Sequence, residues 1–298
     1  MKKSLFALSI LSSALMGGSQ AYASVENPIH VVASFTVLAD VVKAVGGDLV
    51  EVKSLVPVNG DPHDFSPTPK DAQDIKHAAA TFVSGEGLET WFTKIVKASG
   101  STQPAVMVSK GIKTHMFDED GHKVRDPHVW NSIPNVMIWV KNIESALVKV
   151  DPNDAATYKI NAAQYLKQLD KLNKKIHHDI NSTPKNNRKV LTSHDAFGYY
   201  ANEYGVSFMA PVGVSTETEA TASRVAKLID QIKKEHITTY FLENSNSARL
   251  IKQIAHATGA KPGGELYPEA LSSSEGPAST YLKMMAHNTD LIVSSLKK

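Results

Sequence analysis

The hydrophobic positions of this chain form two kinds of pattern: short β-branched runs and longer stretches with helical spacing. Residues 31–34 and 190–193 are such runs, and each is followed by an amphipathic stretch that reaches a glycine twelve residues later, Gly46 or Gly205. This order is typical of a strand, a helix and the glycine that ends the helix. The same template recurs more faintly at 80–83 with Gly100 and at 239–242 with Gly259.

This repetition predicts an α/β fold with two lobes of parallel βαβ units. The sheets are expected to be parallel because each helix carries the chain back to the start of the next strand. We expect strands near residues 29–34, 51–57, 81–84 and 105–109 in the first lobe, and near 189–193, 206–210, 239–242 and 265–267 in the second.

A purely helical pattern separates the two halves. One helix is expected near 135–150, and another starts at Asp151-Pro152, a suitable N-cap and first-turn pair. Apolar positions then recur in steps of three and four from Ala155 to Ile180, which predicts one rigid helix of ~30 residues and ~45 Å that joins the lobes. The alternative is a projecting helical hairpin. The predicted division is a leader at 1–23, an N-terminal lobe at 24–134, a helical connector at 135–182 and a C-terminal lobe at 183–298.

The N-terminus has the layout of a cleavable secretory signal. Lys2-Lys3 precede an apolar stretch over residues 5–16, and small and polar residues ending in Ala21-Tyr22-Ala23 follow. Because the apolar stretch is shorter than the ~20 residues that span a bilayer, a retained membrane anchor is the weaker alternative.

Composition narrows the possible locations and partners. The sequence contains no cysteine, so we expect neither disulfides nor a lipid-modified N-terminal cysteine. We therefore expect an exported monomer without a lipid anchor, diffusing in the periplasm of a bacterium with two membranes. Removal of the two leader lysines takes the formal net charge from +2 to 0, which gives no electrostatic basis for binding nucleic acid or an anionic bilayer.

Three histidines follow predicted strands: His63 the second, His128 the fourth and His194 the fifth. Ligands of open α/β sheets bind beyond the carboxyl ends of the strands, so these imidazoles are expected to meet between the lobes. Glu269, just after the last strand, is the expected fourth ligand. Glu243 also follows a strand, and it is the alternative fourth ligand or a carboxylate that supports the site. Three imidazoles and one carboxylate predict a transition-metal site.

The neighbours of these histidines also suggest roles. A proline precedes His63 and His128 and restricts the backbone there, which favours preorganised ligands. Asp64, Asp126 and Asp195 are each positioned to orient an imidazole or, equally well, to cap a turn or helix.

Two other segments carry chemistry-bearing residues. The segment 115–122 holds two histidines and an acidic run, which we interpret as a solvated polar loop rather than a metal-gathering one. Ser193-His194-Asp195 has the residue types of a hydrolase triad, but adjacent side chains cannot line up nucleophile, base and orienting group.

The chain resembles the metal-specific (cluster A-I) solute-binding proteins of bacterial ABC importers for zinc, manganese and iron. The similarity spans the whole mature chain and depends on Asp-Pro-His-Asp-Phe-Ser-Pro at 61–67, Asp-Pro-His-Val-Trp at 126–130, Thr-Ser-His-Asp-Ala-Phe at 192–197, and the segment 264–281. The resemblance implies two α/β lobes joined by a rigid long helix, a buried metal site between them, and an inner-membrane ABC permease as partner. It also implies His63, His128, His194 and the carboxylate after the last strand as ligands.

The chain departs from the common pattern of this family in two ways. Glu269 stands where many members carry aspartate, and the short segment 115–122 replaces a long histidine-rich insertion. A closed site of three imidazoles and one carboxylate favours Zn²⁺, whereas a bidentate Glu269 would suit Mn²⁺. The function we expect is capture of the ion and its delivery to the permease, without enzymatic activity. The alternatives are a zinc-dependent hydrolase and a metal-stabilised surface adhesin.

Overall fold

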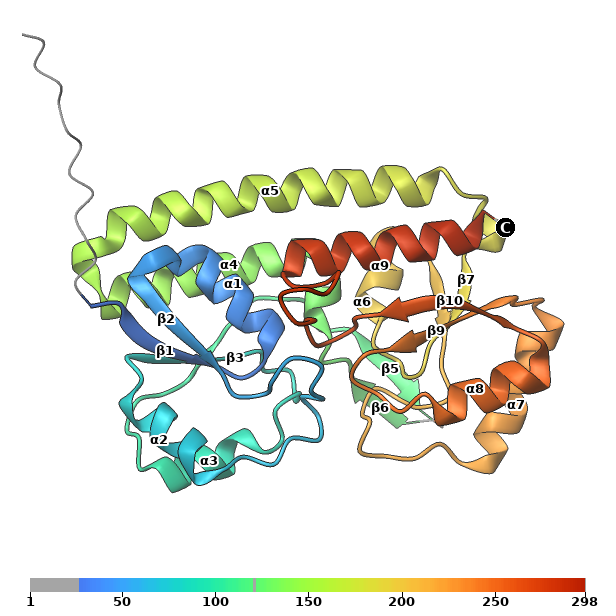
Figure 1. Ribbon diagram of the computed structural model, residues 1–298, viewed down its shortest axis with the longest axis horizontal. Helices are drawn as coiled ribbons and strands as arrows, with labels where there is room; N and C mark the ends of the chain where they lie inside the picture. Colours follow the sequence, from blue (N-terminus) through green and yellow to red (C-terminus); the bar gives the residue numbers. More distant parts are fainter. Residues whose placement is uncertain (1–26, 120–121, 298) are drawn as a thin grey trace, which may run out of the picture.

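The computed structural model describes residues 27–119 and 122–297 and contains two parallel sheets, each with four strands (Figure 1). The signal sequence expected at 1–23 lies outside the described residues. The first sheet has the order β2-β1-β3-β4 and the second β10-β9-β7-β8. The strands are β1 (Ile29–Ala33), β2 (Val50–Ser54), β3 (Ala80–Val83), β4 (Val106–Met107), β7 (Lys189–Leu191), β8 (Ser207–Met209), β9 (Thr239–Glu243) and β10 (Lys261–Leu266).

Helices connect the strands as the repeated pattern predicts. Gly100, Gly205 and Gly259 each follow the last residue of a helix in the left-handed conformation, with φ of 67°, 74° and 80°. The first helix ends at the expected Gly46, and the residue with positive φ is the next one, Gly47, at 58°. The helices are α1 (Thr36–Gly46), α2 (Pro69–His77) and α3 (Phe92–Ser99) in the first lobe, and α6 (Gly198–Tyr204), α7 (Ala222–Lys234) and α8 (Arg249–Thr258) in the second. Short 3₁₀ helices are η1 (Gly47–Leu49), η2 (Val129–Asn131), η3 (Pro152–Asp154) and η4 (Lys185–Asn187).

The long helix α5 (Ala155–Asn181) runs along both lobes, with α4 (Ile133–Val150) beside one part and α9 (Tyr281–Leu296) beside another (Figure 1). Its apolar stripe, which includes Tyr158 and Leu169, is buried, so the alternative of a projecting hairpin was wrong. Its 27 residues extend about 40 Å at the usual rise. The expected start was also wrong, because Asp151 precedes the separate 3₁₀ helix η3 and α5 begins at Ala155.

One hydrophobic core joins the lobes to the connector. A single buried cluster includes Val31 of the first sheet, Leu169 of α5, Tyr200 of the second lobe and Tyr281 of α9. A smaller cluster around Leu191 lies within the second lobe. The first sheet, the long helices and part of the second lobe therefore share one continuous hydrophobic core. The expectation of two α/β lobes with parallel sheets and a long helix is confirmed.

The segment expected as a polar loop at 115–122 instead enters a two-stranded antiparallel hairpin. Its strands are β5 (Met116–Glu119) and β6 (His122–Arg125), and Phe117 pairs with Val124. The hairpin is tied to the second lobe, because the His115 N–H donates to the Tyr199 hydroxyl at 2.9 Å. Within residues 27–119 and 122–297, no helix combines the length and apolarity needed to cross a bilayer.

Candidate metal centre

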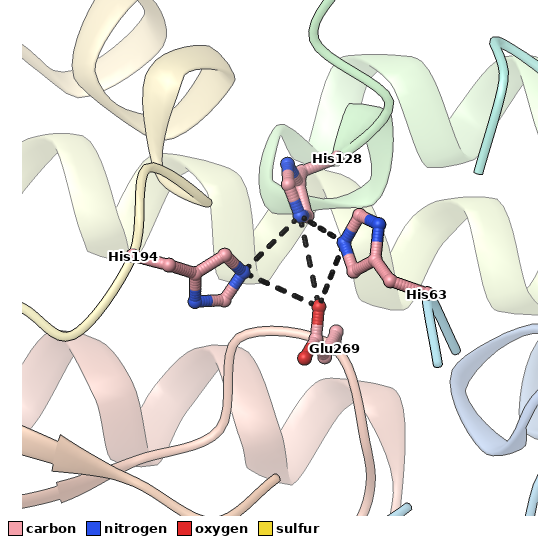
Figure 2. A group of neighbouring side chains, drawn as sticks. All are labelled: His63, His128, His194 and Glu269. Atoms are coloured by element: carbon pink, nitrogen blue, oxygen red, sulfur yellow. Dashed lines mark hydrogen bonds and ion pairs between the residues drawn. The ribbon is translucent and has the colours of Figure 1, made fainter. Parts of the chain in front are cut away.

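Four buried side chains converge between the lobes, namely His63, His128, His194 and Glu269 (Figure 2). One nitrogen from each imidazole and one carboxylate oxygen all lie within 4.8 Å of one another. His128 Nε2 lies 3.1 Å from His63 Nε2 and 3.4 Å from His194 Nε2. Glu269 Oε2 lies 3.3, 3.6 and 3.4 Å from Nε2 of His63, His128 and His194.

These separations match the edges of a small coordination polyhedron. A tetrahedral zinc ion with bonds of about 2.0–2.1 Å has ligand atoms about 3.3–3.4 Å apart. The Nε2 atoms of His63 and His128, 3.1 Å apart, cannot both donate to each other, so at least one of them presents its lone pair to the site. Glu269 Oε2, although fully buried, has no hydrogen-bond partner within the described residues. The donor set and its geometry therefore fit a divalent transition metal.

His63 is held by the loop that follows β2. Its backbone N–H donates to Asp61 Oδ1 at 2.8 Å, and Trp91 Nε1 donates to the carbonyl of Pro62 at 2.9 Å. Asp61 Oδ2 accepts from the Thr216 hydroxyl at 2.6 Å, which ties this first-lobe loop to the second lobe. The other end of the loop is fixed by the capping box that starts α2.

His128 follows the hairpin and is oriented by Asp126. One carboxylate oxygen, Asp126 Oδ1, accepts from both the backbone N–H of His128 at 3.0 Å and its Nδ1 at 2.9 Å. Because an ionised carboxylate can only accept, the proton resides on Nδ1 and Nε2 presents its lone pair to the site. Burial alone would lower the pKa of His128, but the hydrogen bond to Asp126 and the nearby Glu269 carboxylate raise it above its usual value.

His194 follows β7 and is oriented by Glu243 at the end of β9. Glu243 Oε2 lies 2.6 Å from His194 Nδ1, and Oε1 accepts the backbone N–H groups of Ser193 and His194 at 2.9 and 3.3 Å. Burial alone would lower the pKa of His194, but the charges of Glu243 and Glu269 raise it well above its usual value. Glu243 therefore supports a histidine and is not a member of the converging group.

Glu269 lies on the segment that follows β10. Side chains of the N-terminal lobe bind the backbone of this segment. The carbonyl of Pro268 accepts from Trp130 Nε1 at 2.7 Å and from Asn131 Nδ2 at 3.1 Å. Burial alone would raise the pKa of Glu269, but the three imidazoles hold it well below its usual range. The carboxylate is thus ionised and faces three nitrogen atoms.

The roles expected of three neighbouring aspartates divide. Asp126 orients an imidazole, whereas Asp195 pairs with Arg224 at 3.0 Å and Asp64 is exposed. Asp61, for which no role was expected, fixes the backbone of His63 and binds Thr216 of the second lobe. The repeated Asp-Pro-His motif could have indicated this role, because in both copies the aspartate accepts the backbone N–H of the histidine two residues later.

A cavity lies beside the centre, on the His194 side. This cavity of about 570 Å³ adjoins His194 and is lined by the loop around Asp61 and Asp64 and by second-lobe residues including Thr216 and Glu219. Of the four candidate ligands, His194 alone lines this cavity.

Comparisons with known proteins find similarity to metal-binding proteins of ABC importers. The profile of the family described as "Zinc-uptake complex component A periplasmic" matches residues 31–295. The chain is 30% identical to the manganese-binding lipoprotein MntA of Halalkalibacterium halodurans over all of both proteins. It is 31% identical to the iron ABC transporter substrate-binding lipoprotein MtsA of Streptococcus pyogenes over 91% of this chain and 89% of the relative. The solved structure of the periplasmic zinc-binding protein TroA of Treponema pallidum is similar with a TM-score of 0.85 and 28% identity, over 91% of this chain and 99% of TroA.

Proposed function

Since the chain belongs to the family of periplasmic zinc-uptake complex component A proteins, we propose that it captures Zn²⁺ with His63, His128, His194 and Glu269 and delivers it to an ABC permease. The coarser function follows directly from the family. The chain is the extracytoplasmic metal-binding component of an ABC importer, and it is a binding protein rather than an enzyme. The ligand set and the choice of zinc are the proposed refinements.

The observation that carries the ligand assignment is the convergence of four ligand atoms from both lobes within 4.8 Å. His63 and His128 come from the lobe assigned to 24–134, and His194 and Glu269 from the lobe assigned to 183–298. An ion that bridges the two pairs would screen the charge on Glu269 and satisfy the facing nitrogens. It would also hold the lobes together, so the loaded and the empty protein would differ in how the lobes are arranged. The permease could recognise this difference.

The chemistry of the donors supports zinc. Three neutral imidazoles and one carboxylate suit zinc and its four-coordinate shell, whereas manganese favours more oxygen donors and higher coordination. Manganese is the second candidate because the relatives include a protein named as manganese-binding.

The proposed location is the periplasm, where the protein would diffuse freely as a monomer after cleavage of its signal. Relatives from Halalkalibacterium and Streptococcus are named lipoproteins, but this sequence has no cysteine to carry a lipid. Deletion of the chain should impair metal uptake, whereas a metal-stabilised adhesin would leave uptake unchanged.

The ligand assignment is tested with single alanine variants. Each of His63→Ala, His128→Ala and His194→Ala should weaken zinc binding by at least about 100-fold in competition with a chelator, because each removes one of four bonds to the ion. His177→Ala is the matched control, since that imidazole pairs with Glu203 away from the site. Zinc binding that survives all three site variants would contradict the proposed function.

A further inference from the structure

The two carboxylate oxygens of Glu269 have different surroundings. Oε2 faces the three imidazole nitrogens at 3.3, 3.6 and 3.4 Å. Oε1 instead accepts a hydrogen bond from the Ser245 hydroxyl at 2.7 Å, and the amide nitrogen Nδ2 of Asn246 lies 3.4 Å from it. One oxygen is therefore aimed at the site, and the other is bound by the loop after β9.

The loop that holds Oε1 is itself anchored within the site. Asn246 Nδ2 donates to Glu243 Oε2 at 2.9 Å, and that oxygen also lies 2.6 Å from His194 Nδ1. The residues 243–246 thus contact both second-lobe groups of the cluster, the imidazole through Glu243 and the carboxylate through Ser245. A rotation of Glu269 that turned both oxygens toward an ion would break the Ser245 hydrogen bond. Such a rotation would therefore give up a charge-assisted hydrogen bond of a fully buried carboxylate.

The number of carboxylate oxygens that bind the ion affects which metal the site prefers. With Oε1 bound to a hydroxyl, the centre supplies three nitrogens and one oxygen, which is a complete shell for tetrahedral zinc. Manganese needs additional oxygen ligands, and a bidentate glutamate is the nearest source of one. The cluster of converging ligands in the described part of the chain contains no second carboxylate.

We propose that Ser245 is a positioning residue that sets the metal selectivity of the site, by binding Glu269 Oε1 and so limiting this ligand to one oxygen. The inference rests on the proposed function, because it requires Glu269 to be a ligand. It explains how a chain can select zinc although related proteins are named for manganese and iron.

The test compares Ser245→Ala with the wild-type protein in competition titrations with zinc and with manganese. Removal of the 2.7 Å charge-assisted hydrogen bond leaves Oε1 with only the 3.4 Å contact from Asn246 Nδ2 among the described residues. We therefore expect the ratio of zinc to manganese affinity to fall by about tenfold or more, mainly through tighter manganese binding. Ser247→Ala is the matched control, since that serine is exposed two positions along the same loop. Ser245→Thr keeps the hydroxyl and should keep the wild-type ratio. An unchanged ratio in a folded Ser245→Ala protein would overturn the inference.

A second measurement depends on no variant. A crystal structure of the zinc-loaded wild-type protein should show three histidine nitrogens and a single oxygen of Glu269 bound to the ion. Two glutamate oxygens at bonding distance would overturn the role of Ser245 while leaving the proposed function intact. A zinc ion bound elsewhere in the wild-type protein, with no contact to the three histidines, would instead refute the proposed function and the inference with it.

Discussion

Replacement of Glu243 by glutamine tests how the site is supported, because glutamine keeps the size of the side chain and removes its charge. Glu243 Oε2 lies 2.6 Å from Nδ1 of His194, and both groups are buried. Loss of a partner that orients a metal-ligating histidine weakens metal binding by about 10–100-fold, or about 1.4–2.7 kcal/mol. We expect Glu243→Gln to fall in the upper part of this range at pH 8.5, because the contact is short and buried.

The same substitution should change the pH dependence of binding. Glu243 and Glu269 raise the pKa of His194 well above its usual value, so at lower pH zinc must displace a proton from wild-type His194. In Glu243→Gln this pKa falls, and the proton competes less. The affinity loss caused by the substitution should therefore shrink as the pH decreases from 8.5 to 6.

Competition titrations with a zinc chelator at several pH values measure both effects. The matched control is Glu203→Gln, which alters another histidine–carboxylate pair, with His177 Nε2 3.0 Å from the carboxylate, outside the metal centre. This control should bind zinc like the wild-type protein. An affinity for Glu243→Gln equal to that of the wild type, or a loss that does not depend on pH, would refute the reasoning.

Three further outcomes are expected. Wild-type zinc affinity should fall as the pH drops through the raised pKa of His194, starting above the value of about 6.5 typical of a free imidazole, and equal Kd values at pH 5 and pH 7.5 would contradict histidine ligation. Trp130→Phe removes the 2.7 Å hydrogen bond to the carbonyl of Pro268. In urea titrations it should lower the free energy of unfolding by about 1 kcal/mol more than Trp139→Phe does, because Trp139 Nε1 has no hydrogen-bond partner in the described residues. Free zinc at 100 times Kd should raise the free energy of unfolding by about 2.7 kcal/mol, and a chelator should reverse the accompanying rise in Tm.

The main elements of the fold could be predicted because burial dictates them. Runs such as 31–33 and 190–191 are fully buried and β-branched or aliphatic, which is the pattern that a parallel strand covered on both faces requires. The hairpin of β5 and β6 was missed because its strands are short and mostly polar, so no alternation of buried and exposed positions marks them.

The convergence of the four candidate ligands could be predicted because each follows a strand, and parallel strands deliver their carboxyl ends to one edge. Their supports were harder to predict. Asp126 and Asp195 both lie within two residues of a histidine, yet Asp126 accepts from the His128 imidazole whereas Asp195 pairs with Arg224, because side-chain direction depends on the local turn. Ser245 belongs to an ordinary polar loop, and its contact with Glu269 arises only when two segments 24 residues apart come together.

The most direct test of the account is a crystal structure of the zinc-loaded protein with anomalous diffraction recorded at the zinc edge. The account predicts a single strong peak between the lobes, within about 2.0–2.2 Å of Nε2 of His63, His128 and His194 and of one oxygen of Glu269. A zinc peak elsewhere on the molecule, or one that leaves any of these four side chains unbound, would contradict it.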